Sequence, residues 1–93
     1  MSRMAKVHTI KILKDFCDAL MSGEKSFEIR ENDRGYQTGD VLQFIPVDSS
    51  GLPVKHRIEH EVFDVYYILS GWGLKNGFVC MSIKRRGADD END

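Results

Sequence analysis

The chain is poor in cysteine and proline, with only two of each among its 93 residues. Cys17 and Cys80 are far apart in the sequence, and neither has a partner at the short spacing of a metal site. Two thiols are also too few for the disulfide framework of a small secreted domain. We therefore expect buried free thiols in a reducing, cytoplasmic compartment, and neither a metal nor a cofactor.

Long apolar runs are missing as well. No stretch approaches the roughly 18 residues of a membrane-spanning helix. The N-terminal sequence MSRMAKVHTI has basic residues but no apolar segment or small-residue cleavage site of a secretion signal. We expect no membrane partner.

A strong charge of one sign is also absent, since the formal net charge is −2. The terminal GADDEND holds four of the 15 acidic side chains, which leaves 13 basic and 11 acidic ones in residues 1–88. Such a nearly neutral body does not favour non-specific nucleic-acid binding, which needs many phosphate contacts. A local basic site remains compatible with this composition.

A length of 93 residues with 41% hydrophobic side chains fits one small globular domain. We expect a flexible N-terminus over residues 1–6, a single domain over 7–85 and a disordered acidic tail over 86–93.

The first predicted elements are a strand and a helix. Residues 7–13 alternate, and His8, Ile10 and Ile12 share one face. The following segment places Phe16, Ala19 and Leu20 at helical spacing, with Cys17 and Met21 beside them, and Gly23 as the C-terminal stop.

Four further strands are predicted. They span residues 26–31, 41–47, 54–69 (a long run, bent in the middle) and 78–85, separated by turn-rich segments and a glycine-rich loop over 70–77. Short connections favour antiparallel pairing. The order indicates an α+β, mostly β fold: a small, partly closed barrel of about five strands with one early helix.

The segment GEKSFEIR, residues 23–30, combines a strand pattern with dense charge. Glu28 and Arg30 share one face of the predicted strand, while Phe27 and Ile29 share the other. We expect the apolar pair to point inward and the charged pair to point away from the core. Lys25 has the parity of Phe27, so it lies in the preceding turn or runs along the core to a rim.

This segment resembles the GxKxxExR signature of the ASCH (activating signal cointegrator homology) superfamily, whose domains are small β-barrels similar to PUA domains. The resemblance extends from residue 7 to residue 84 through FEIRENDRGYQTGDVLQF and YYILSGWGLKNGFVCMSI. It is closest to a bacterial and phage branch known chiefly as a domain of unknown function. It implies a PUA-like barrel with a cleft beside the helix, and RNA or a nucleotide-like molecule as ligand.

Carried over to this sequence, the resemblance implies a cleft lined by Lys25, Glu28 and Arg30, with Asn32, Asp33 and Arg34 on its rim. Arginine grips phosphate or stacks on a base, lysine supplies a point charge, and carboxylate and amide groups read exocyclic amines.

Aromatic residues in the loops are able to stack on unpaired bases. Tyr36 and Trp72 are the candidates, although Trp72 equally fits an anchor onto the barrel. Alternation places one of Tyr66 and Tyr67 in the core. His8 shares a face with isoleucines, which favours a structural, hydrogen-bonded role.

Three functions stay open at this point: an RNA- or nucleotide-binding module, a metal-independent hydrolase acting on a modified nucleoside or RNA, and a protein-interaction accessory module. Amidohydrolases of the superfamily use a hydroxyl residue three positions after the signature lysine, where this chain has Glu28. This departure argues against that mechanism, for which Glu59 or Glu61 is the candidate distal carboxylate. Lys25, Glu28 and Arg30 are the candidate catalytic groups for cleavage of RNA, with Glu28 as base and Arg30 on the phosphate. We expect a monomer.

Overall fold

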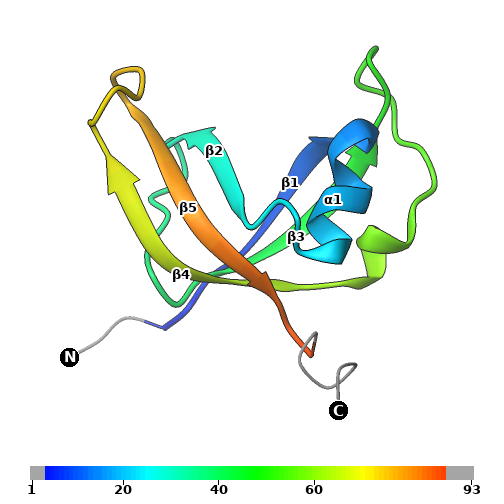
Figure 1. The fold of residues 1–93 in the computed structure, drawn as a ribbon, viewed down its shortest axis with the longest axis horizontal. Helices are drawn as coiled ribbons and strands as arrows, with labels where there is room; N and C mark the ends of the chain where they lie inside the picture. Colours follow the sequence, from blue (N-terminus) through cyan, green and yellow to red (C-terminus); the bar gives the residue numbers. More distant parts are fainter. Residues whose placement is uncertain (1–3, 88–93) are drawn as a thin grey trace.

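The computed structural model describes residues 4–87, and most of them form a β-structure with one α-helix (Figure 1). The elements are β1 (Val7–Leu13), the 3-10 turn η1 (Lys14–Phe16), α1 (Cys17–Ser22), β2 (Phe27–Glu31), β3 (Val41–Val47), the 3-10 turn η2 (Arg57–His60), β4 (Phe63–Ser70) and β5 (Phe78–Arg85). The predictions for residues 1–3 and 88–93 lie outside the described part. No helix within residues 4–87 combines the length and apolarity needed to cross a membrane.

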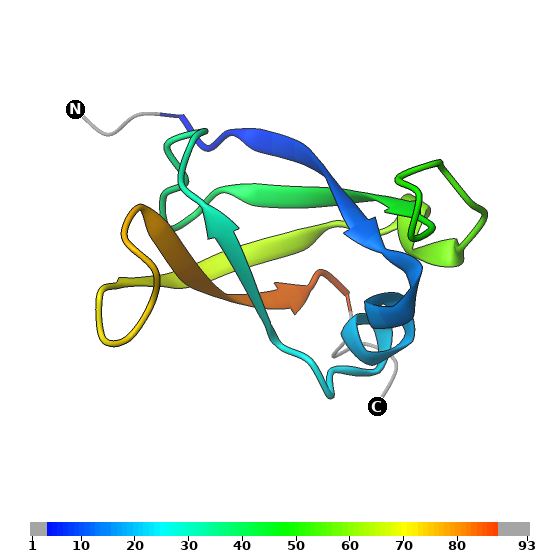
Figure 2. The same ribbon diagram turned by 90° about the horizontal axis from the view of Figure 1, so that it is seen from above.

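The five strands form one sheet in the order β1-β3-β4-β5-β2. β3, β4, β5 and β2 pair antiparallel, whereas β1 and β3 pair parallel. The expectation of antiparallel pairing is therefore wrong for β1, because α1 and β2 intervene before the chain returns beside it. The sheet curves so that its two edge strands, β1 and β2, border one opening with α1 at its end (Figure 2). The predicted partly closed, mostly β fold is confirmed.

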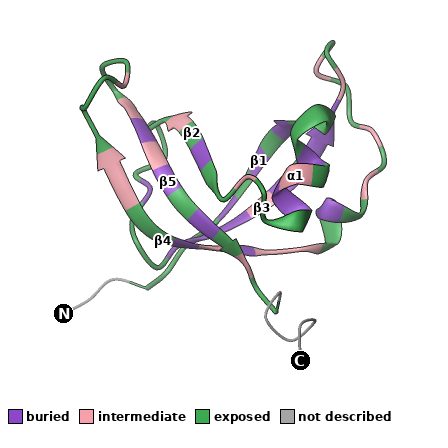
Figure 3. Ribbon diagram, in the orientation of Figure 1, coloured by how far each residue is buried: buried purple, intermediate pink, exposed green. Residues whose placement is uncertain are grey.

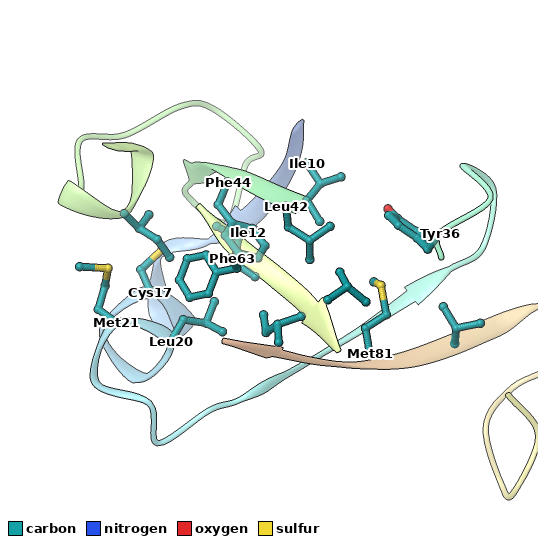
Figure 4. Packing of buried hydrophobic residues seen from close by; sticks show 14 residues of the cluster. Ile10, Ile12, Cys17, Leu20, Met21, Tyr36, Leu42, Phe44, Phe63 and Met81 are labelled. Carbon is teal, nitrogen blue, oxygen red and sulfur yellow. The ribbon is translucent and has the colours of Figure 1, made fainter. Parts of the chain in front are cut away.

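The core fills the concave side of this sheet (Figures 3 and 4). In β1 the residues His8, Ile10 and Ile12 are buried and their neighbours are exposed, as the alternation predicts. The largest fully buried side chains include Phe44 and Phe63, whose rings meet edge to face at 5.2 Å. Alternation therefore identifies the inner face of this strand, whose outer face carries Thr9 and Lys11.

The early helix is shorter than predicted, because its first turn is the 3-10 turn η1. Cys17, Leu20 and Met21 are buried on α1, whereas Phe16 is exposed and does not join the core. Gly23 ends the helix in the left-handed region at φ 88°, and its N–H donates to Ala19 O at 3.1 Å. The predicted end of the helix at Gly23 is confirmed. The buried face of the helix includes Cys17 in place of the predicted Phe16.

The faces of β2 are the reverse of the prediction. Glu28 is only 4% exposed, while Phe27 and Ile29 are 42% and 47% exposed. The cause is the register with β5, which places Glu28 opposite Met81, a fully buried residue. Directly opposed residues in an antiparallel pair point to the same face, so Glu28 faces the interior.

The long strand predicted over residues 54–69 is wrong in its first half, where η2 forms instead. His56 caps this turn: its Nδ1 accepts from Ile58 N at 3.0 Å, and Glu59 accepts from His56 N at 3.2 Å. A histidine in the place of the usual serine or threonine hides this capping box from a sequence pattern.

The β4 strand contains an irregularity that alternation does not predict. The register with β5 shifts between Val65 and Tyr67, and both Tyr66 and Tyr67 are exposed. The prediction that one of these tyrosines belongs to the core is therefore wrong. A bulge of this kind inserts an extra residue and breaks the period of two.

Candidate functional site

The two edge strands of the sheet, β1 and β2, are not paired with each other, and we call the gap between them the seam. A cavity of about 590 Å³ lies at this seam, lined mainly by residues from the end of β1, from η1 and from β2. Its polar wall contains Lys25, Glu28 and Arg30, the three charged residues of the signature. Its apolar wall includes Phe16 and Ile29. The sequence-predicted residues are thus brought to one open concavity, and the unexpected exposure of Phe16 and Ile29 supplies its apolar lining.

The three charged residues form one ion-pair network centred on Glu28. Lys25 Nζ lies 2.9 Å from Glu28 Oε1, and Arg30 Nε lies 2.7 Å from Glu28 Oε2. Both oxygens of the buried carboxylate therefore accept charge-assisted hydrogen bonds, which are stronger than neutral ones. This pairing explains how a carboxylate is tolerated inside the domain, since an unpaired buried charge is costly.

Lys25 is held at the wall of the cleft by further contacts. Its ammonium donates to Phe27 O at 2.8 Å and lies 5.3 Å and 4.7 Å from the ring centroids of Phe16 and Phe27. Its backbone N–H donates to Ala19 O at 3.0 Å, just after the helix stop at Gly23. The end of α1 therefore aims Lys25 between two aromatic rings.

Two arginines bridge the seam between the unpaired edges of β2 and β1. A terminal nitrogen of Arg30 donates to Lys11 O, and Arg34 Nη1 donates to Thr9 O at 3.1 Å. Carbonyl groups on a free sheet edge need such donors. Arg30 is thus partly a structural bridge, and its Nη1 group has no hydrogen-bond partner among residues 4–87.

The predicted rim residues have separate roles. Asn32 Oδ1 accepts from Tyr36 N at 2.9 Å, and Asn32 N donates to Gly77 O at 2.9 Å, so this residue joins the turn after β2 to the β4–β5 loop. Asp33 and Arg34 are exposed beside it. None of the three lines the cavity itself, although they follow directly on Glu31, which does.

Tyr36 is not an accessible loop aromatic, and the interpretation as a stacking platform is wrong. It is 5% exposed and lies at the end of the core away from Cys17 and Met21 (Figure 4). Its ring packs against His8 at 4.7 Å, and burial raises the pKa of its hydroxyl. A tyrosine in a glycine- and aspartate-rich segment gives no signal of such packing.

The structural role predicted for His8 is confirmed. His8 Nε2 lies 2.8 Å from Asp40 Oδ2, and the same carboxylate accepts from Lys6 N and Gln37 N. Asp40 is nearly fully buried. This network joins the entry of β1 to the turn before β3 and lies away from the cavity lining.

Trp72 projects from the β4–β5 loop and is 89% exposed. It is not anchored onto the barrel, and it does not line the cleft. The sequence did not identify Lys11 and Phe16 as cleft residues, yet both line it. Lys11 lies near the end of the edge strand β1 and Phe16 in the turn η1 that follows it.

The two candidate distal carboxylates, Glu59 and Glu61, are not brought to the cleft. Glu59 is used in the η2 cap, and Glu61 pairs with Arg85 at 3.3 Å. Neither of them lines the cleft. Within residues 4–87 there is also no group of three or more His, Cys, Asp or Glu side chains placed to hold a metal ion.

Fold and site together define a small, partly closed β-domain with a charged cleft at the seam of its sheet. The sequence matches, over residues 7–83, the family described as "Domain of unknown function (DUF3850)", and the chain belongs to this family. It is also similar to the "Uncharacterized 12.9 kDa protein in GpA 3'region" of Escherichia phage P2. The two are 33% identical over 69 residues, which make up 74% of this chain and 62% of the phage protein. The chain thus spans less than two thirds of that relative.

Proposed function

We propose that this domain is an ASCH-type, PUA-like module that binds RNA or a nucleotide-like molecule in the cleft at the seam. The observation that carries the proposal is the convergence of Lys25, Glu28 and Arg30 on one open cavity that also exposes aromatic rings. A concave, largely apolar site with a few convergent polar groups is the usual form of a small-ligand pocket.

The lining suits a flat, charged ligand. Phe16 and Phe27 expose ring surface on which a base can stack. The Nη1 group of Arg30 and the exposed ammonium of Lys11 are available to a phosphate or a carbonyl oxygen. Glu28 has both oxygens occupied, so its role is to orient Lys25 and Arg30 and not to read a base directly.

Binding fits the site better than hydrolysis by the signature lysine. A lysine that acts as a base must direct its nitrogen at the substrate, whereas the Lys25 nitrogen is engaged by Phe27 O and Glu28 Oε1. Glu28 lies 2.9 Å from Lys25 Nζ. The ion pair therefore supports Lys25 as a fixed positive charge in a binding site.

The test is a titration of fluorescent short single-stranded RNAs and nucleotides with the wild-type protein and three variants. Lys25→Gln and Lys11→Gln remove cleft charges, and Lys55→Gln removes an exposed lysine outside the cleft. We expect roughly 10-fold weaker binding for each cleft variant, as for a lost charged hydrogen bond, and no change for Lys55→Gln.

Lys11 lies outside the ion-pair network, so Lys11→Gln separates a loss of binding from a loss of folding. Circular dichroism confirms the fold of every variant. Equal losses in all three variants, or no binding by the wild type, would refute the proposal. Release of product from acetylcytidine or RNA, above a Lys25→Gln control, would favour a hydrolase instead.

A further inference from the structure

The β4–β5 loop, residues 71–77, presents the chain's single tryptophan to solvent. Figure 1 shows this loop projecting beyond β4 and β5, at the end of the sheet away from α1. Trp72 is 89% exposed, the highest value among the large hydrophobic residues of the described part. Aromatic side chains of this size normally bury most of their surface.

The backbone holds Trp72 in this position. Its φ of 53° is the only positive value for a non-glycine residue within 4–87, and Gly71 and Gly73 on either side are also left-handed. Leu74 N donates to Gly71 O at 3.0 Å and closes the turn around the indole. A bulky residue in this region is strained. Neither the strained backbone nor the exposed side chain of Trp72 stabilises the fold, so both features point to a role outside it.

A second cavity, of about 510 Å³, lies at the foot of this loop. Its lining includes Asn32, Lys75, Asn76 and Phe78. Phe78 also lines the cleft at the seam, so the two cavities adjoin at this ring. The hydrogen bond from Asn32 N to Gly77 O fixes the loop to the end of β2. The two cavities thus share Phe78, and loop residues Gly71 and Leu74, on either side of Trp72, line the second one, although Trp72 itself lines neither.

The chemistry between the cleft and this loop suits bases more than phosphates. Lys75 supplies one ammonium, 5.6 Å from the centroid of the Phe78 ring, and Asn76 supplies an amide that donates and accepts. Glu31 and Asp33 are exposed at the same end of β2 and offset the positive charge of the neighbouring Arg34. An indole beside an amide and few cations favours stacking and edge contacts over tracking of a backbone.

We propose that Trp72 is a second stacking contact for a single-stranded nucleic acid, one nucleotide of which occupies the cleft at the seam. This inference rests on the proposed function and extends it. The domain then binds an oligonucleotide more tightly than a mononucleotide, because only the longer ligand reaches from the cleft to the loop.

The single tryptophan makes the test direct, since its intrinsic fluorescence reports on Trp72 alone. An oligonucleotide of about eight nucleotides, within the usual span of such sites, and a mononucleotide are each titrated into the wild type. We expect the oligonucleotide to quench Trp72 emission and the mononucleotide to bind without quenching it.

Trp72→Ala, Trp72→Phe and a control, Tyr67→Ala, complete the experiment, with binding read from labelled ligands. Tyr67 is an exposed aromatic on β4, outside the loop that carries Trp72 and absent from the lining of both cavities. We expect Trp72→Ala to weaken oligonucleotide binding about 10-fold, and Trp72→Phe to retain most of it. Mononucleotide binding should stay unchanged in all three.

Two results overturn the inference, and they are distinguishable. If both ligands bind with equal affinity and Trp72→Ala changes neither, the cleft binds nucleotides but Trp72 takes no part. If neither ligand binds the wild type, the proposed function fails and the inference fails with it.

Discussion

Glu28 holds the site together at the scale of a single residue. Its buried carboxylate accepts from both Lys25 and Arg30, so its loss leaves two half-buried cations without their partner. We expect Glu28→Gln to lower the free energy of unfolding by about 3 kcal/mol, measured by urea denaturation.

The matched control is Glu24→Gln, which removes an exposed carboxylate from the same segment. Surface substitutions of this kind usually change stability by less than about 0.5 kcal/mol. Equal stability of Glu28→Gln and the wild type would contradict the role assigned to the ion-pair network.

Tyr36 gives the domain a specific sensitivity to alkaline pH. Burial raises the pKa of its hydroxyl, so the folded state holds this proton more tightly than the unfolded chain. The resulting stability is complete below the ordinary tyrosine pKa of about 10 and is lost as the pH rises through the folded value. We therefore expect the wild type to lose stability above about pH 10 relative to Tyr36→Phe.

Chemical denaturation of both proteins between neutral pH and the alkaline range measures this difference. Parallel pH profiles for the two proteins would show that Tyr36 does not titrate from a buried position.

At the scale of elements, the end of α1 depends on one backbone conformation. Gly23 has a φ of 88°, and a Cβ added there would meet no atom within 4 Å, so substitution strains only the backbone. We expect Gly23→Ala to destabilise the domain by about 1 kcal/mol, and Gly23→Asn by less, since asparagine tolerates this region. Thermal unfolding of the two variants measures the order, and a less stable Asn variant would contradict it.

Strand patterns predict some elements of this fold fully and others only in part. In β1 the polar residues Thr9 and Lys11 lie on one side and three buried residues on the other, so the sequence alone gives the strand and its inner face. In β2 the pattern predicts that Phe27 and Ile29 point inward, but pairing with Met81, far away in the sequence, buries Glu28 instead. Local sequence predicts the strand but not its orientation.

The same limit applies to the candidate site. The charge pattern predicts that Lys25, Glu28 and Arg30 belong together, because they lie within six residues. It does not predict that Arg30 and Arg34 bridge to β1, since these contacts join residues 19 and 25 positions apart. Contacts across the seam follow only from the curvature of the whole sheet.

At the scale of the whole molecule, the cleft exists because the sheet closes incompletely. β1 and β2 are the two edges of the sheet order, and arginine side chains bridge them in place of a backbone ladder. The cavity lies along this seam, between β2 and the end of β1. Under the proposed function, the groups that complete the fold are therefore the same few residues that meet the ligand.

The most direct measurement is an NMR titration of the isotope-labelled domain with a nucleotide mixture and a short single-stranded RNA. The account predicts saturable shifts of amide signals around the cleft, at Lys11, Phe16, Lys25 and Arg30, with the outer tyrosines of β4 unchanged. Absence of any saturable shift, or shifts confined to surfaces away from the seam, would contradict the claim that this cleft binds a nucleotide-like ligand.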